Sequence, residues 1–437
     1  MATKRATAAI ISMALACSVV LVGTPVVAGV ALPPFYEAAA KLKAEGKLGQ
    51  IVKREPVATG LPGARAWRIV YISSDALERK TLASALVVAP VGPAPKQGRP
   101  VIAWAHGTTG TAQNCGPSQV FDPAQPLNQY FLVGGNSWTD YGLPSVDAFI
   151  KQGYVVVGTD YQGLGAGGKH QYAVSASNGR DVINSVRAAS SMKETGGGGK
   201  AIVYGWSQGG GATLAAASLA GYIAQNGTAA DGIAFLGFVA LAPHEIAAMA
   251  PKGTLDAAGA AKMLEELVTN FSDNVFNFSH FAMLLWGTQA AYPDTRLTDI
   301  FTDEGAATFD KIASQKCMHP TSDTLNYTFG ANFKTLLKPE VTNALAWSKA
   351  FVDGSVPPVK PVAPVIIYWG TADTVVPPVM GQLYRKQMCG LGANVTRVQL
   401  DGKQTHFSTP GAAAPLYLPW IADRFADRPI ADGCTVP

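Results

Sequence analysis

Short apolar runs and amphipathic segments follow one another along most of the chain. Two early apolar runs, residues 67–72 and 82–88, flank a polar turn and predict an antiparallel hairpin. Later apolar runs typical of buried strands are residues 101–105, 153–158, 201–204, 232–241, 364–369 and 394–400. Segments with helical periodicity are residues 35–45, 146–151, 178–193, 212–224, 378–388 and 416–425. Eight strands, the later ones alternating with helices, predict an α/β fold: a mostly parallel sheet with helices on both faces.

The pattern changes between residues 247 and 354. This stretch has helical patches at 255–268, 306–314 and 340–351, but no run typical of a buried strand. It predicts a helical cap, residues 247–354, inserted between two parts of the core, residues 32–246 and 355–437. Its aromatic residues include Phe271, Phe276, Phe278, Phe281, Trp286 and Tyr292. We expect most of them to form a core within the cap and hypothesise that some line a substrate tunnel.

The N-terminus has the pattern of a secretory signal. Lys4 and Arg5 precede an apolar stretch, residues 8–22, and small residues at 26–28 or 29–31 offer a cleavage site. A retained membrane anchor is less favoured, because Ser18, Gly23 and Pro25 interrupt the apolar stretch. Residues 1–31 are therefore interpreted as a cleavable signal peptide, which predicts a secreted or extracytoplasmic protein.

Cleavage would leave four of the five cysteines, Cys115, Cys317, Cys389 and Cys434. An even number in an exported chain predicts two disulfides, with three connectivities open. A net charge of +4 without a basic run argues against nucleic acid as a partner. The sequence shows no obligate protein partner, and without CxxC or HExxH spacing it predicts no metal site.

Candidate chemistry centres on Gly205-Trp206-Ser207-Gln208-Gly209, which lies between a predicted strand and a predicted helix. This context is typical of the nucleophile elbow, a tight turn that exposes a serine. Glycines two residues to either side are needed because the turn is strained and crowded. We interpret Ser207 as a catalytic nucleophile; the alternative is a serine that only caps the helix.

A nucleophilic serine needs a base, and the base needs an acid to orient it. His406 lies just beyond the last predicted strand, and Asp373 follows the penultimate one. Because carboxyl ends of parallel strands share one edge of a sheet, we expect Ser207, Asp373 and His406 to converge. Asp373 could instead cap the following helix. The other late histidines, His244, His280 and His319, are expected to be surface or structural residues, although His244 could border the site.

The negative charge on a tetrahedral intermediate needs two backbone donors. The amide of Gln208, directly after the nucleophile, is one candidate. The second is expected from the loop that follows residues 101–105, at Thr108 or Thr109, with Thr108 preferred. His106 is expected to hold this loop in place.

A further glycine pattern, Gly163-x-Gly165-x-x-Gly168, matches a dinucleotide-binding loop and nearly matches a phosphate-binding loop. His170 stands where a Ser or Thr would hold magnesium, and no helix follows at once. We expect no cofactor here and interpret the segment as a flexible loop near the substrate entrance.

Together these motifs resemble those of the α/β-hydrolase superfamily and, more narrowly, the secretory lipases of the fungal lipase-A type. The resemblance runs from about residue 32 to the C-terminus. It rests on Leu32-Pro33-Pro34-Phe35-Tyr36, His106-Gly107-Thr108-Thr109-Gly110, Asn114-Cys115-Gly116-Pro117-Ser118, Thr159-Asp160-Tyr161-Gln162-Gly163-Leu164-Gly165, Gly205-Trp206-Ser207-Gln208-Gly209-Gly210, Gly370-Thr371-Ala372-Asp373 and Thr405-His406. One departure is that the fungal members carry a carboxylate where this chain has His106-Gly107-Thr108.

The resemblance implies an α/β-hydrolase fold with a helical lid, and ester hydrolysis through an acyl-enzyme without metal or cofactor. It also favours the pairs Cys115–Cys317 and Cys389–Cys434. The expected substrate is a small-molecule or lipid ester, with contact to a lipid interface. Alternatives are an exported peptidase or polyester depolymerase of the same superfamily, or a binding protein that kept the fold without the chemistry.

Overall fold

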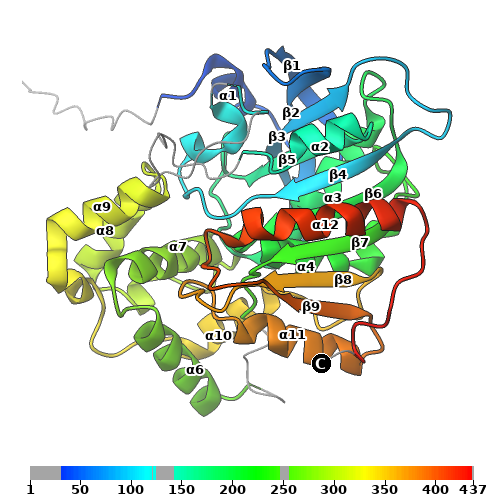
Figure 1. Ribbon diagram of the computed structural model, residues 1–437. Helices are drawn as coiled ribbons and strands as arrows, with labels where there is room; N and C mark the ends of the chain where they lie inside the picture. The colour runs from blue at the N-terminus through cyan, green and yellow to red at the C-terminus, as the bar shows by residue number, and fades with distance from the viewer. Residues whose placement is uncertain (1–30, 121, 125–141, 247–254, 436–437) are drawn as a thin grey trace, which may run out of the picture.

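The computed structural model describes residues 31–120, 122–124, 142–246 and 255–435. Apart from Ala31, the predicted signal peptide lies outside these residues. In this described part of the chain, nine strands form one sheet in the order β1-β2-β3-β5-β4-β6-β7-β8-β9 (Figure 1). The strands are β1 Ile51–Val57, β2 Ala64–Ser74, β3 Lys80–Pro90, β4 Arg99–Ala105, β5 Val155–Gln162, β6 Gly197–Trp206, β7 Ala234–Leu241, β8 Val365–Trp369 and β9 Val395–Gln399.

The sheet is antiparallel from β1 to β5 and parallel from β5 through β4 to β9. The expected mostly parallel α/β sheet is therefore present, but the expected number of eight strands is wrong. The additional strand is β1, an edge strand that carries charged residues and Pro56 and has no fully buried residue. An edge strand tolerates proline and charge, so it lacks the apolar pattern by which the other strands are predicted.

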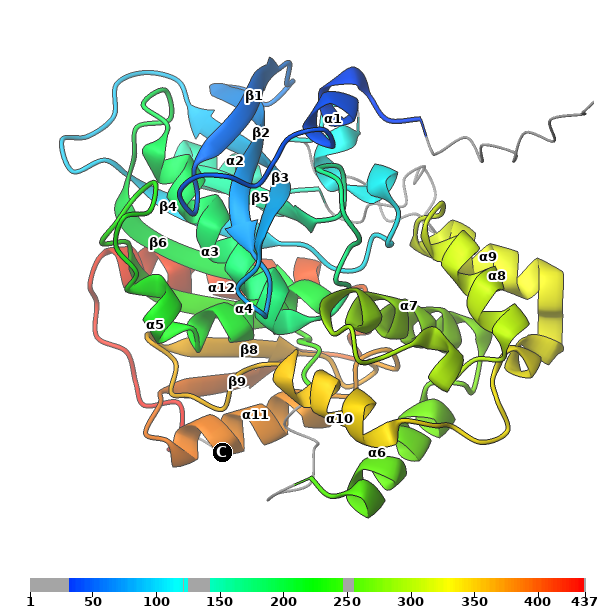
Figure 2. The same cartoon turned by 180° about the vertical axis from the view of Figure 1, so that it is seen from behind.

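Helices cover both faces of the sheet (Figure 2). On one face α3 (Ser175–Ser191), α4 (Gln208–Ala217) and α11 (Val379–Gly390) contribute side chains to one apolar core. On the other, α2 (Val146–Lys151) and α12 (Thr409–Phe425) pack into a second core. Two short helices, α1 (Pro34–Ala39) and α5 (Ala220–Ile223), complete the body.

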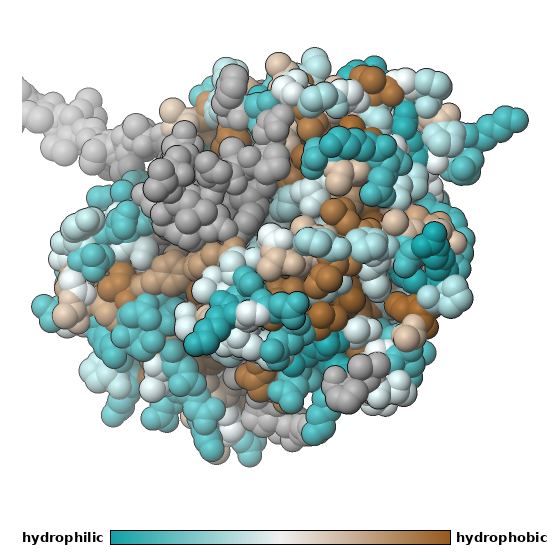
Figure 3. All heavy atoms as spheres, in the orientation of Figure 1, coloured by the Kyte–Doolittle hydropathy of each residue, from teal (hydrophilic) through white to brown (hydrophobic). Residues whose placement is uncertain are grey.

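Among the described residues between β7 and β8, five α-helices gather at one side of the sheet (Figure 1). They are α6 Ala257–Asn270, α7 Val275–Ala291, α8 Asp303–Ala313, α9 Met318–Phe329 and α10 Ala344–Asp353. We call this segment, residues 257–353, the helical insertion. It has an apolar core of its own, which includes Phe278, Phe281 and Trp286 from α7, as well as Trp347 from α10. In this view the surface of the insertion is mostly hydrophilic, with some hydrophobic residues among the hydrophilic ones (Figure 3).

Two disulfides join distant parts of the chain. Cys115, in the loop after β4, is bonded to Cys317 at the start of α9, with 5.5 Å between their Cα atoms. Cys389 of α11 is bonded to Cys434 near the C-terminus, with 5.7 Å between Cα atoms. These are the pairs that the family resemblance implied. In the part of the chain that the structure describes, no helix is both long and apolar enough to cross a membrane.

Candidate active site

Ser207 occupies the sharp turn between β6 and α4. Its backbone has φ 59° and ψ −119°, a combination that residues other than glycine rarely adopt. Three hydrogen bonds hold the turn: Ser207 N–H donates to Leu241 O at 3.0 Å, and Ser207 O accepts from Gly211 and His244 N–H, each at 3.1 Å. The strained conformation is therefore fixed by the sheet and by the loop after β7.

The two glycines of the turn are required by close packing. A Cβ atom on Gly205 would overlap the carbonyl of Gly209, and one on Gly209 would overlap the carbonyl of Ala105. This is the physical reason for the G-x-S-x-G spacing. The absence of side chains at Gly205 and Gly209 lets the first turn of α4 pack against the end of β4. The backbone amide of Gln208 lies at the positive end of this helix, where amides have no acceptor within the helix.

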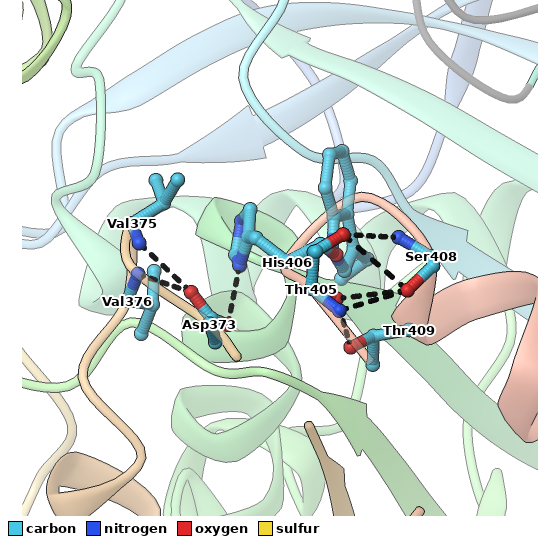
Figure 4. A network of polar contacts seen from close by, with 8 residues as sticks. Asp373, Val375, Val376, Thr405, His406, Ser408 and Thr409 are labelled. Atoms are coloured by element: carbon cyan, nitrogen blue, oxygen red, sulfur yellow. Dashed lines mark hydrogen bonds and ion pairs between the residues drawn. The ribbon is translucent and has the colours of Figure 1, made fainter. Parts of the chain in front are cut away.

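Asp373 and His406 meet in loops after neighbouring strands. The Asp373 carboxylate, in the loop after β8, lies 2.8 Å from His406 Nδ1, in the loop after β9, and both side chains are buried. The other oxygen of Asp373 accepts hydrogen bonds from the amides of Val375 and Val376, each at 2.9 Å (Figure 4). With Nδ1 donating to the carboxylate, Nε2 of the neutral imidazole is the ring atom that can accept a proton.

His406 and Ser207 line the same small cavity. It has a volume of about 10 Å³, and Thr108 is among the other residues that line it. His406 Nε2 is buried and has no hydrogen-bond partner among the residues that the structure describes. Trp206 steadies the histidine: its indole N–H donates to His406 O at 3.0 Å, and the two rings lie 4.8 Å apart. The three residues predicted to converge are thus brought to one place.

The two threonines predicted as alternative oxyanion donors have different surroundings in the structure. Thr108 lines the cavity with Ser207, and its hydroxyl lies 2.7 Å from the hydroxyl of Tyr172. Thr109 is buried, and its carbonyl accepts from the amide of Met318 at 3.0 Å. Thr109 is not among the described residues that line the cavity, so the position of Thr108 is the better one for an oxyanion donor.

His106 lies beneath this loop. Its ring nitrogens face the carbonyls of Gly107 at 2.6 Å and Asp160 at 3.3 Å. Burial lowers the pKa of His106 to about 4, so the imidazole is neutral at physiological pH. A neutral side chain between two segments of backbone is the arrangement expected of a residue that holds the loop.

Sequence reasoning missed how many histidines face the site. A second cavity of about 40 Å³ adjoins Ser207, and His244 and His280 line it; His319 lines the smaller cavity beside His406. Burial and the nearby His406 lower the pKa values of His244 and His280 to about 4. The expectation of surface or structural roles is therefore incomplete for these residues. In α7 the sequence signal is a single histidine, His280, directly before the apolar run at residues 281–286.

The glycine pattern at 163–168 lies elsewhere. A Cβ atom on Gly163 would overlap the backbone of His170, and one on Gly165 would contact the ring of Tyr36 at 2.7 Å. α3 begins only at Ser175, so no helix N-terminus follows the glycines at once. Within the described part of the chain these glycines line neither cavity at Ser207, so the interpretation as a loop near the substrate entrance lacks support.

Known proteins resemble this chain in sequence and in fold. The family described as "Secretory lipase" matches residues 136–246 and 255–433. Lipase 9 of Candida albicans is 25% identical over 94% of this chain and 87% of its own length, and Lipase 4 of the same organism is 25% identical over 95% and 87%.

Two solved structures share the fold. Candida antarctica lipase A has a TM-score of 0.67 at 17% identity, covering 93% of this chain and 88% of its own. The rice cell wall degrading esterase LipA from Xanthomonas oryzae has a TM-score of 0.59 at 18% identity, covering 86% and 98%. The sheet with flanking helices is therefore that of the α/β-hydrolases. Since the family match covers more than half of its length, this chain belongs to the secretory lipase family.

Proposed function

We propose that this lipase hydrolyses carboxylic esters, such as acylglycerols, through an acyl-enzyme formed on Ser207. His406 Nε2 takes the proton of the Ser207 hydroxyl while Oγ attacks the ester carbonyl, and Asp373 holds the imidazole in the tautomer that this step needs. The same histidine then protonates the departing alcohol. Water, activated by His406, releases the acid in the second half of the reaction. The observation that carries this proposal is the Asp373–His406 hydrogen bond with Nε2 free at the cavity of Ser207.

The oxyanion formed in each half-reaction is assigned to two backbone amides. The amide of Gln208 is fixed by the strained turn, and that of Thr108 lies in the loop supported by His106 and by the disulfide at Cys115. Donors held in place before the reaction stabilise developing charge without reorganising. Thr109 is the less favoured alternative, because its carbonyl and side chain are buried away from the cavity.

A direct test is covalent labelling. A fluorophosphonate probe mimics the acyl donor: an activated serine attacks its phosphorus, fluoride leaves, and the serine is phosphonylated. We expect it to modify the purified protein at one position, Ser207, identified by mass spectrometry of the labelled peptide, and to stop hydrolysis of p-nitrophenyl butyrate. Absence of labelling would favour the catalytically silent binding protein. Labelling with release of amino acids or polyester oligomers, but not fatty acids, would favour the peptidase or depolymerase.

We propose that residues 247–354 act as a lid over a core formed by residues 32–246 and 355–437. The cavity between Ser207 and α7 has a volume of only about 40 Å³, room for no more than a few water molecules. An ester with a fatty acyl chain needs several times this space. Substrate entry therefore requires the helical insertion to move away from Ser207, and contact with a lipid surface would favour that movement by covering its apolar inner face.

The wall of this cavity is expected to set the preferred acyl chain length. Phe271, Phe281 and Leu284 of the helical insertion line it. Replacing Phe281 with alanine removes a ring beside Ser207, so we expect the preference in a series of p-nitrophenyl esters to shift toward longer chains by several carbons. Phe333→Ala, at a buried site in the core of the insertion, is the matched control. Unchanged chain-length profiles in Phe281→Ala would contradict a substrate tunnel at this wall.

We further propose that residues 1–31 direct export and are then removed. The family is one of secretory lipases, and two disulfides tie the folded chain. Disulfides persist in oxidising compartments outside the cytosol. The substrate would accordingly be met outside the cell, as a soluble ester or in a lipid phase.

A further inference from the structure

The side chain of Gln208 has no part in the mechanism above, which uses only its backbone amide. This side chain is buried, and its Nε2 lies 3.1 Å from His170 Nε2 and 3.1 Å from Asn178 Oδ1. Its Oε1 is also buried but has no hydrogen-bond donor among the residues that the structure describes. An unpaired buried carbonyl costs free energy, so it calls for an explanation.

The surrounding network fixes which way this amide points. Burial lowers the pKa of His170 to about 3, so its ring is neutral, and its Nδ1 donates to Gln162 O at 2.8 Å. Nε2 of His170 is therefore an acceptor. Asn178 uses its Nδ2 to donate to Gln171 O at 3.2 Å, which leaves its Oδ1 as an acceptor too. A flipped Gln208 amide would place Oε1 against two acceptors, so the orientation with Nε2 toward them is the favourable one.

This orientation leaves Oε1 without a partner on a residue that lines the substrate cavity. Gln208 lines the 40 Å³ cavity together with Ser207, whereas neither His170 nor Asn178 lines it. The NH₂ end of the amide is thus turned to residues behind the cavity wall. The polar residues that share the cavity with Gln208 are Tyr172, Ser207, His244, Asn277 and His280, and none of them donates to Oε1. The hydroxyl of Tyr172 is paired with that of Thr108, at 2.7 Å.

We propose that Gln208 Oε1 is a specificity-determining group that accepts a hydrogen bond from a substrate hydroxyl close to the scissile ester. The inference rests on the function proposed above. The hydroxyl can belong to the acid, as in a hydroxyacyl ester, or to the alcohol, as in a partial glyceride or glycol ester. In either case a site with a buried acceptor discriminates against an analogue that cannot donate, because that analogue leaves the acceptor unpaired.

The test compares donors with matched non-donors in the same enzyme. For the acid side, ethyl 3-hydroxybutyrate competes with ethyl 3-methoxybutyrate; for the alcohol side, 2-hydroxyethyl butyrate competes with 2-methoxyethyl butyrate. The measured quantity is the kcat/KM of the hydroxyl ester divided by the kcat/KM of its methoxy analogue. This ratio does not depend on the amount of active enzyme. In one of the pairs we expect the wild-type ratio to exceed that of Gln208→Met by about tenfold, the effect of one hydrogen bond to a buried acceptor.

Two more variants separate this role from a structural one. Gln119 is a second glutamine whose Oε1 is buried and unpaired, but it lies away from both cavities at Ser207, so Gln119→Met should keep the wild-type ratio. His170→Phe keeps Gln208 but removes an acceptor that orients its amide, so the ratio should fall toward that of Gln208→Met.

The outcomes distinguish this inference from the proposed function. If the wild-type protein hydrolyses neither these esters nor ethyl butyrate, the proposed function itself fails. If it hydrolyses them and both ratios are the same in wild type and Gln208→Met, the assignment of Oε1 to substrate is overturned. A change confined to the acid pair or to the alcohol pair identifies which part of the substrate carries the hydroxyl.

Discussion

Replacing Ser207 with alanine or glycine is expected to lower the turnover of p-nitrophenyl butyrate by about 10⁴- to 10⁶-fold, because both variants lack the nucleophile. The two should differ in stability. Alanine keeps a side chain at φ 59° and ψ −119°, whereas glycine adopts this conformation without strain. Ser207 makes no side-chain capping bond to α4 that either change would remove. We therefore expect the glycine variant to be more stable than the alanine variant by about 1 kcal/mol.

Turnover is measured in the steady state, and stability is measured by thermal or denaturant unfolding. Ser185→Ala, at a buried serine of α3 whose hydroxyl donates to Val182 O, is the matched control and should retain activity. Hydrolysis by Ser207→Ala at a rate comparable to wild type would refute the assignment of the nucleophile. Equal stability of the alanine and glycine variants would show that the turn is not strained.

The second large effect is expected for Asp373→Asn, with a loss of about 10⁴-fold in kcat at neutral pH. Two backbone amides, those of Val375 and Val376, donate to one oxygen of Asp373. An asparagine would keep its oxygen there and turn its NH₂ group toward His406 Nδ1. Nδ1 would then have to accept, the proton would move to Nε2, and the imidazole could no longer take the proton of Ser207.

Asp401→Asn provides the control, because Asp401 lies on the loop before His406 but is exposed to solvent. It should change kcat little. If Asp373→Asn keeps near wild-type turnover while the protein remains folded, Asp373 does not orient the base. The tautomer of His406 in the variant can be followed by NMR of ¹⁵N-labelled imidazole, which separates loss of the proton acceptor from loss of the fold.

How far the sequence predicts this molecule depends on which residues are buried. Most strands of the parallel region carry a run of buried apolar residues, and the turn at Ser207 follows from two glycines, so these were predictable. β1 is not, because an edge strand with Pro56 carries no apolar pattern. The start of α12 was predicted too late: the helix begins at Thr409 and contains Pro415 and Pro419, residues that disfavour a helix interior.

In the candidate site, too, some residues could be predicted from the sequence and others could not. Ser207, Asp373 and His406 each follow a strand, so local sequence suffices to place them at one edge of the sheet. The cavity wall does not follow from local sequence. His280 and Phe281 reach Ser207 only through the packing of α7, and the orientation of Gln208 depends on residues from β5, α3 and the loop between them. Such contacts arise from tertiary packing, which no periodicity along the chain records.

The disulfide between Cys115 and Cys317 restricts how the enzyme can open. It fastens the first residues of α9 to the loop that carries Thr108, and hydrogen bonds from Met318 N–H to Thr109 O and from the Thr111 hydroxyl to Ala313 O reinforce the attachment. Because this disulfide does not break during turnover, the α8–α9 end of the insertion stays attached to the loop that carries Thr108. We therefore expect the opening proposed above to turn the insertion about this attachment, so that Phe281 moves away from Ser207 while the loop that carries Thr108 keeps its position.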